Sequence, residues 1–190
     1  MTREHWLDSA VTALRPDFVA AGFPLSATAI KVSVGFPSSR ATANTSRSIG
    51  QCFDRAAADG IPQLFVSPVL DNPTRVLDVL VHELIHAAVG CKCGHTGAFR
   101  RAALALGLKG KMTATTAGEA LTARLTALAA DLGAYPHAAL SLAGQRKQTT
   151  RLLKAECVPC GYVVRLSRLM ITAHGCPICP SCHSSMMEPV

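Results

Sequence analysis

The stretch from Asp71 to Gly90 constrains the fold of this chain more than any other part of the sequence. Asn72 can cap the first turn of a helix, Pro73 needs no hydrogen-bond donor in that turn, and Gly90 can end the helix. Between these boundaries apolar residues occur on nearly every side of a helical projection. The sequence therefore predicts a central, buried helix.

The predicted helix contains His82-Glu83-Leu84-Ile85-His86, an H-E-x-x-H pattern. Side chains four residues apart lie one turn above each other, so His82 and His86 can bind one ion. Glu83 can hold a zinc-bound water and move its proton without ligating the metal. The alternative is two core histidines and a chance glutamate, which would bury three polar groups with no evident partner. We predict a catalytic zinc site with Glu83 as the catalytic residue.

A catalytic zinc usually has three protein ligands, so a third donor is needed beyond His86. We predict His95, because the glycines around it allow the chain to double back onto the helix. Cys91 and Cys93 are rival ligands, although additional thiolates would close the site and make it structural. Glu119 is another rival, but Thr116 to Glu119 also resembles a capping box that opens a helix ending at Gly133.

The C-terminal part of the sequence predicts a second zinc site. Two C-x2-C pairs, Cys157 with Cys160 and Cys179 with Cys182, stand eighteen residues apart. Four thiolates in such knuckles form a closed tetrahedral structural site, and the strand-like residues between them indicate a zinc ribbon whose return runs from 171 to 175. Cys176 forms a competing C-x2-C pair with Cys179; we favour Cys182 as the ligand.

Composition bounds the class of protein. A chain of 190 residues, half of them apolar, can form one ordinary domain and a small appendage. No secretory segment and no membrane-spanning run is evident, which favours a cytoplasmic protein. Eight cysteines in a reducing compartment are better explained as metal ligands and free thiols than as disulfides.

The positive charge of the chain is concentrated in its second half. Residues 91 to 190 contain 12 of the 19 Lys and Arg residues but only 4 of the 12 Asp and Glu residues. This imbalance makes nucleic acid, and DNA in particular, the first candidate for an acidic partner. On charge alone, a solvated basic surface with no partner stays an open alternative. The residues that we expect to contact DNA are Arg151, Lys154, Arg165 and Arg168.

The remaining patterns predict an α+β fold. Residues 4–21 indicate a helix that Pro16 kinks or ends early, and residues 30–34, 48–53 and 63–67 indicate three short strands of one sheet. Residues 107–115 are read as a basic connector. The predicted domains are a catalytic domain at 1–140, a linker at 141–150 and the ribbon at 151–190.

The chain resembles the SprT-like (Spartan-type) zinc metalloproteases in the order of its motifs. The resemblance rests on the H-E-x-x-H pattern, on His95 followed by Gly97 and Phe99, and on the four ribbon cysteines. It implies a minigluzincin-like protease domain that acts on proteins bound or crosslinked to DNA. Thr96 departs from the family pattern, which usually has glycine directly after the third histidine.

The sequence thus predicts a zinc-dependent endopeptidase with one catalytic and one structural Zn²⁺. Its expected partners are a protein substrate and DNA, with no membrane. Two alternatives stay open at this point. One is a non-catalytic zinc-containing DNA-binding protein, and the other is a metal-dependent nuclease, in which Glu83 would have no required role.

Overall fold

The chain divides into two units, Met1–Leu142 and Ala143–Val190, which are described separately. The structure is a computed structural model, and it describes residues 1–26, 29–144, 152–183 and 188–189. Most of the predicted linker at 141–150 lies outside the described residues. Both units combine helices with small sheets, which confirms the predicted α+β class. Among the described helices, none has the length and apolarity needed to span a membrane.

Helix α2 (Pro73–Val89) is the centre of the first unit. Its predicted boundaries are confirmed: the Asn72 side chain accepts a hydrogen bond from the Arg75 N–H at 2.9 Å, and Gly90 ends the helix with a φ of 83°. Ten of its side chains are buried, including Asp78, Glu83 and His86. The helix contacts the sheet and the other helices of the unit, so its polar groups lie inside the fold.

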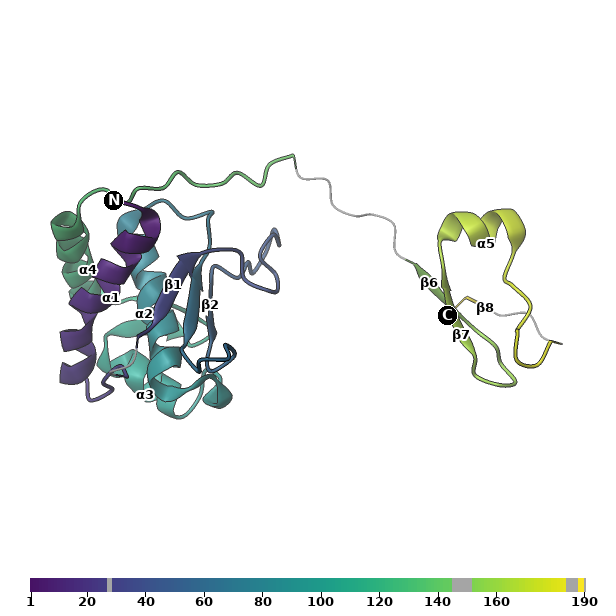
Figure 1. Cartoon of the computed structure of the whole chain (residues 1–190), viewed down its shortest axis with the longest axis horizontal. Coiled ribbons are helices and arrows are strands. Elements are labelled where there is room, and N and C mark those ends of the chain that lie inside the picture. Colours follow the sequence, from purple (N-terminus) through teal and green to yellow (C-terminus); the bar gives the residue numbers. More distant parts are fainter. Residues whose placement is uncertain (27–28, 145–151, 184–187, 190) are drawn as a thin grey trace. The chain divides into compact units, whose positions relative to one another are not determined.

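A three-stranded sheet covers α2. Its strands are β1 (Lys31–Val34), β2 (Gly50–Phe53) and β3 (Gln63–Val66), in the order β1-β3-β2. β1 runs parallel to β3, whereas β2 runs antiparallel to it. The three strands predicted before helix α2 are therefore confirmed. β2 lies at one edge of this sheet and packs beside α2 (Figure 1).

Helix α1 (Arg3–Ala20) continues through Pro16, so the prediction that this proline ends the helix early is wrong. Pro16 is exposed, and the turn that follows it is held by tertiary contacts. Phe18 is fully buried, and the Arg124 guanidinium donates hydrogen bonds to both carboxylate oxygens of Asp17 and to the Ala13 carbonyl. These contacts offset the hydrogen bond that proline cannot make.

Residues 107–115, predicted as a connector, belong instead to a hairpin of β4 (Leu108–Lys111) and β5 (Ala114–Ala117). The hairpin follows η1 (Cys91–Cys93) and α3 (Ala98–Ala105) and leads into α4 (Glu119–Leu132). The predicted capping box is absent, because Thr116 pairs with Lys109 in the hairpin and Gly118 occupies the N-cap without a side-chain bond.

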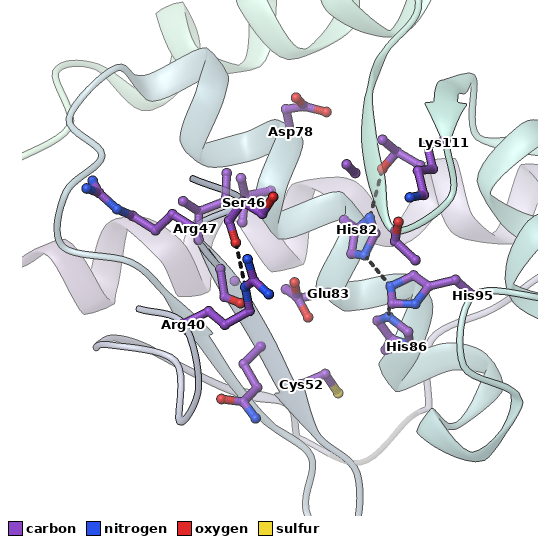
Figure 2. Close-up of a pocket in the computed structure, with 18 of the residues that line it drawn as sticks. Arg40, Ser46, Arg47, Cys52, Asp78, His82, Glu83, His86, His95 and Lys111 are labelled. Atoms are coloured by element: carbon purple, nitrogen blue, oxygen red, sulfur yellow. Dashed lines mark hydrogen bonds between the residues drawn. The ribbon is translucent and has the colours of Figure 1, made fainter. Parts of the chain in front are cut away.

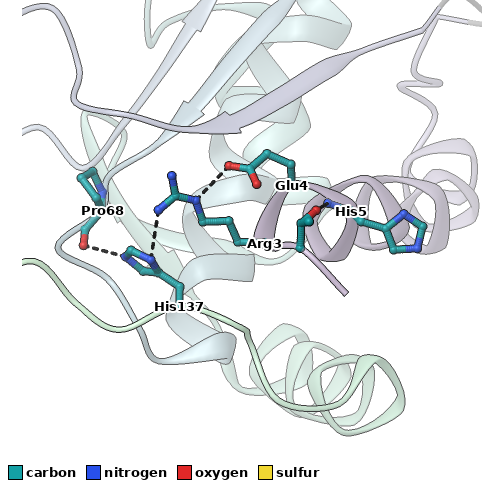
Figure 3. A network of polar contacts seen from close by, with 6 residues as sticks. Arg3, Glu4, His5, Pro68 and His137 are labelled. Atoms are coloured by element: carbon teal, nitrogen blue, oxygen red, sulfur yellow. Dashed lines mark hydrogen bonds and ion pairs between the residues drawn. The ribbon is translucent and has the colours of Figure 1, made fainter.

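The segment after α4 is structural. Tyr135 is buried with its ring centroid 4.9 Å from that of Trp6, whose indole N–H donates to the Gly133 carbonyl. The His137 ring contacts the Pro68 carbonyl through Nε2 and Arg3 through Nδ1, as Figure 3 shows. Because the arginine donates to Nδ1, Nε2 carries the proton that the carbonyl accepts. These contacts fix the chain after α4 onto α1.

The second unit contains a three-stranded sheet in the order β7-β6-β8. Its strands are β6 (Leu153–Glu156), β7 (Val163–Leu166) and β8 (Glu188–Pro189). Residues 171–175, predicted to carry the return of the ribbon, are helical rather than extended: they form the end of helix α5 (Arg168–His174) and its C-cap, Gly175. The Ser167 side chain caps this helix by accepting from the Met170 N–H at 3.2 Å.

Candidate functional site

Three imidazoles meet at the surface of α2 that faces β2 and the β4–β5 hairpin. His82 and His86 project from successive turns of α2, and His95 reaches them from the segment between η1 and α3. His95 Nε2 lies 3.2 Å from His82 Nε2 and 3.3 Å from His86 Nε2 (Figure 2). The structure therefore brings together all three histidines that the sequence singled out.

The return of the chain toward α2 depends on glycines. Gly90, Gly94 and Gly97 all have positive φ angles, of 83°, 54° and 51°, a region that side chains with a Cβ rarely adopt. This geometry carries His95 back over the end of the helix. Phe99, fully buried at the start of α3, then lies against the three imidazoles, with ring centroids 4.4 to 4.9 Å away.

Thr115 on β5 orients one of these imidazoles. Its hydroxyl oxygen lies 2.7 Å from His82 Nδ1 and can accept a hydrogen bond from an Nδ1–H. With the proton on Nδ1, the lone pair of His82 Nε2 is free to bind a metal. Asp78, one turn before His82 on α2, is buried and forms an ion pair with Arg75. Sequence reasoning missed Thr115, because only the hairpin brings it to α2.

The chemistry of the three donors fits a bound zinc ion. With Zn–N bonds of about 2.0–2.1 Å, a tetrahedral ion separates its ligand nitrogens by about 3.3–3.4 Å, close to the observed spacings. Burial and the neighbouring imidazoles lower the pKa of His82 to about 3 and that of His86 to about 4, and burial lowers the pKa of His95. The rings are therefore neutral, as ligands must be.

Glu83 lies beside this group, in contact with the backbone of β2. A Cβ atom added to Gly50 would lie 2.9 Å from the Glu83 Cδ and 2.7 Å from a Val79 methyl group, so only glycine fits at this point of the strand. Burial raises the pKa of the Glu83 carboxyl to about 8. Sequence reasoning missed Gly50, since nothing in the sequence indicates what faces it.

The three histidines and Glu83 line one cavity of about 830 Å³. The edge of β2 forms part of its wall through Gly50 and Cys52. Along a strand of an antiparallel pair, the N–H and C=O groups of successive residues point alternately toward the partner strand and away from it. The Ile49 carbonyl points toward the chain that includes β3, because it accepts a hydrogen bond from the Ser67 N–H. The N–H and C=O of the next residue, Gly50, therefore point away from β3. The cavity thus combines a potential metal site, a carboxyl group and a strand edge.

The rival ligands are not members of the histidine group, although Cys91 lines the same cavity. The Cys91 thiol donates to the Cys52 carbonyl at 3.5 Å, and the Cys93 thiol donates to the Gly90 carbonyl at 3.2 Å. Neither thiol belongs to the histidine group. Glu119 is exposed at the start of α4 and does not line the cavity.

The second unit contains a group of four cysteines: Cys157, Cys160, Cys179 and Cys182. Their sulfur atoms lie within 4.8 Å of one another, with Cys157 to Cys182 at 3.5 Å and Cys160 to Cys179 at 3.4 Å. A tetrahedral zinc with Zn–S bonds of about 2.3 Å separates its sulfurs by about 3.8 Å. Cys176 packs nearby but is not part of the group. The structure thus pairs Cys179 with Cys182, not with Cys176, in the second C-x2-C knuckle.

The predicted DNA-contacting residues are distributed unevenly. Arg165 on β7 and Arg168 at the start of α5 are exposed, whereas Lys154 on β6 pairs with Glu156 at 2.5 Å. Lys154 and Arg165 are cross-strand neighbours. Arg151 lies outside the described residues.

Comparisons of the chain with protein-family models, with curated protein sequences and with solved structures found no match.

The raised pKa of Glu83 predicts how the stability of the metal-free first unit depends on pH. Between about pH 4.5 and pH 8 the folded protein retains on Glu83 a proton that the unfolded chain has lost, so the contribution of Glu83 to the free energy of unfolding falls as pH rises. The buried histidines contribute in the opposite direction at lower pH, but both proteins contain them and their contribution cancels in the comparison below. A Glu83→Gln variant has no ionisable group at this position. Over that pH window its free energy of unfolding should therefore rise relative to that of the wild type, by an amount on the order of a few kcal/mol at pH 8. Urea unfolding followed by fluorescence of Trp6, the one tryptophan, measures this. A difference independent of pH would contradict the buried carboxyl.

Proposed function

We propose that this chain is a zinc-dependent endopeptidase of the SprT-like type, with a minigluzincin-like catalytic domain and a C-terminal zinc ribbon. One observation carries the proposal: three imidazole Nε2 atoms and one buried carboxyl group share a cavity walled by the edge of a sheet. His82, His86 and His95 would hold a catalytic zinc. The four-cysteine group would hold a structural zinc.

A bound zinc supplies a Lewis acid that acidifies water and polarises a peptide carbonyl. The protein supplies the proton transfer. The Glu83 carboxylate accepts the proton of the attacking water and delivers it to the nitrogen of the leaving amine. Burial raises the pKa of this carboxyl in the metal-free fold, and a zinc ion bound beside it would favour the carboxylate form that accepts the proton.

The strand edge provides a place for the substrate backbone. An extended peptide that lies beside β2 can pair with the N–H and C=O of Gly50, as in strand addition. Because the missing side chain of Gly50 brings this backbone against Glu83, a peptide bound there runs past the catalytic carboxyl.

We extend the proposal to proteins bound or crosslinked to DNA. Its support is the excess of Lys and Arg in the second half of the chain, together with the exposed Arg165 and Arg168. Among the described residues, no acidic side chain pairs with either of these arginines. They are therefore available for phosphate contacts.

The alternative functions make different demands on the site. A non-catalytic zinc protein would be marked by thiolate ligation at the first centre, yet the Cys91 and Cys93 thiols donate to backbone carbonyls. A metal-dependent nuclease has no required use for Glu83, which the fold nevertheless accommodates through Gly50. These observations favour the peptidase.

Glu83→Gln should abolish proteolysis while both zinc ions stay bound, because the amide cannot accept the water proton. The expected loss in the rate of cleavage of a denatured protein is about 10²–10⁴-fold. The matched control is Glu119→Gln, an exposed residue outside the cavity, which should leave the rate unchanged. Parallel incubations with RNA and single-stranded DNA test the nuclease alternative. Undiminished protein cleavage by the Glu83→Gln variant would sink the assignment.

Gly50→Ala should also impair cleavage, because the added methyl group displaces the Glu83 carboxyl. A displacement of about 1 Å can cost about 10²-fold in rate. Gly35→Ala is the matched control: its new methyl group meets the Phe65 ring in the same sheet, but Gly35 does not line the cavity. Zinc content and kcat are measured for both variants. Equal activity of the two would show that the Gly50 contact has no role in catalysis.

A further inference from the structure

The cavity is basic on both sides of Glu83. Six charged side chains other than histidine line it: Arg40, Arg47, Arg75, Lys111, Asp78 and Glu83. Arg75 and Asp78 form an ion pair with each other. Among the described residues, no carboxylate lies within ion-pair distance of the other three basic groups. The wall therefore carries an excess of positive charge.

The two unpaired arginines are held in place by the backbone of their own loop. Arg40 Nε donates to the Ser46 carbonyl at 3.0 Å and Nη2 donates to the Thr45 carbonyl at 3.3 Å. Arg47 Nε donates to the Ala43 carbonyl at 3.1 Å. A guanidinium has five N–H groups, so each arginine keeps donors for a ligand. These hydrogen bonds favour one position of each side chain before any ligand binds, which lowers the entropy lost on binding.

The basic groups flank the candidate catalytic group from opposite directions. In Figure 2, Arg40 and Arg47 lie on one side of Glu83, whereas Lys111 lies on the other side, beyond His82. Lys111 comes from β4, and the two arginines come from the segment before β2. A ligand that passes over Glu83 therefore meets a cation before it and another after it.

We propose that this cleft selects acidic peptides, with Asp or Glu side chains on both sides of the bond that is cut. The inference rests on the proposed peptidase function and adds its substrate class. Carboxylates fit the free N–H groups of the arginines, which favour planar two-point contacts, and Lys111 supplies a point charge on the opposite side. The peptide backbone pairs with the edge of β2.

A peptide fits the cavity better than a single-stranded nucleic acid does. Proteins that bind single strands without base readout stack the bases on aromatic side chains. No Phe, Tyr or Trp is found among the described residues that line this cavity. The strand edge at Gly50, in contrast, offers the backbone N–H and C=O groups that an extended peptide needs.

Binding to the zinc-loaded, full-length Glu83→Gln protein tests the proposal without turnover. The probes are two short, labelled Ala/Ser-rich peptides that differ only in carrying Glu or Gln on both sides of their centre. Fluorescence anisotropy should give a Kd about tenfold lower for the Glu peptide, and the difference should shrink as salt rises. Equal affinities for the two peptides would overturn the proposal.

Further substitutions in the Glu83→Gln protein identify which basic side chains bind the acidic peptide. Lys111→Gln should reduce the preference for the Glu peptide several-fold, whereas Lys109→Gln, two residues earlier on β4 and outside the cavity, should leave it intact. Arg47→Gln should reduce the preference for the Glu peptide in the same way. Its control is Arg101→Gln, at an exposed position outside the cavity, which should leave the preference intact. A preference that survives both cavity variants would contradict the assignment.

Two further readouts separate this inference from the proposed function. If the Glu peptide binds preferentially but zinc-loaded wild-type protein cleaves neither peptide, the peptidase proposal fails and the acidic-ligand cleft stands. If both peptides are cleaved with equal kcat/KM, the acidic preference is wrong and the peptidase stands. A single-stranded oligonucleotide that displaces the Glu peptide at a lower concentration than unlabelled Glu peptide does would overturn the peptide assignment in favour of nucleic acid.

Discussion

The first unit is organised around three imidazole nitrogens: Nε2 of His82 and Nε2 of His86 lie 3.2 Å and 3.3 Å from Nε2 of His95. Burial keeps these rings neutral, so each can turn the lone pair of its Nε2 toward the centre of the group. A cation satisfies such an arrangement, and its binding would stabilise the fold that creates it. The elements around α2 serve this geometry: a glycine-rich turn returns His95, the Phe99 ring backs all three imidazoles, and the β4–β5 hairpin supplies Thr115.

The second unit depends even more strongly on its candidate metal centre. Among its described residues, three apolar or thiol side chains are buried in its core, namely Ala155, Cys157 and Cys179, and two of them belong to the four-cysteine group. So small a core contributes little stability by itself, and in such modules the free energy of zinc binding supplies the free energy of folding.

Local signals in the sequence predicted what depends on local physics. Asn72 and Gly90 bound α2 because capping and chain reversal are properties of single residues, and the cysteine spacing indicated the four-sulfur group. What the sequence could not indicate arises from tertiary contacts. The helix α1 continues past Pro16 because buried neighbours hold its last turn. The strand β4 is short and basic, and it lacks the alternation of apolar and polar residues by which a strand is predicted. The close contact between Gly50 and Glu83 joins two elements that are distant in sequence.

The most direct test of the account is anomalous diffraction at the zinc edge from crystals of the zinc-loaded protein. The account predicts two peaks per chain. The first lies about 2.0–2.1 Å from the Nε2 atoms of His82, His86 and His95, with Glu83 nearby but not bound to it; the second lies about 2.3 Å from the four sulfurs. A first peak ligated by Cys91 or Cys93, or a crystal with no peak at the histidines, would contradict the claim that α2 carries a catalytic zinc centre.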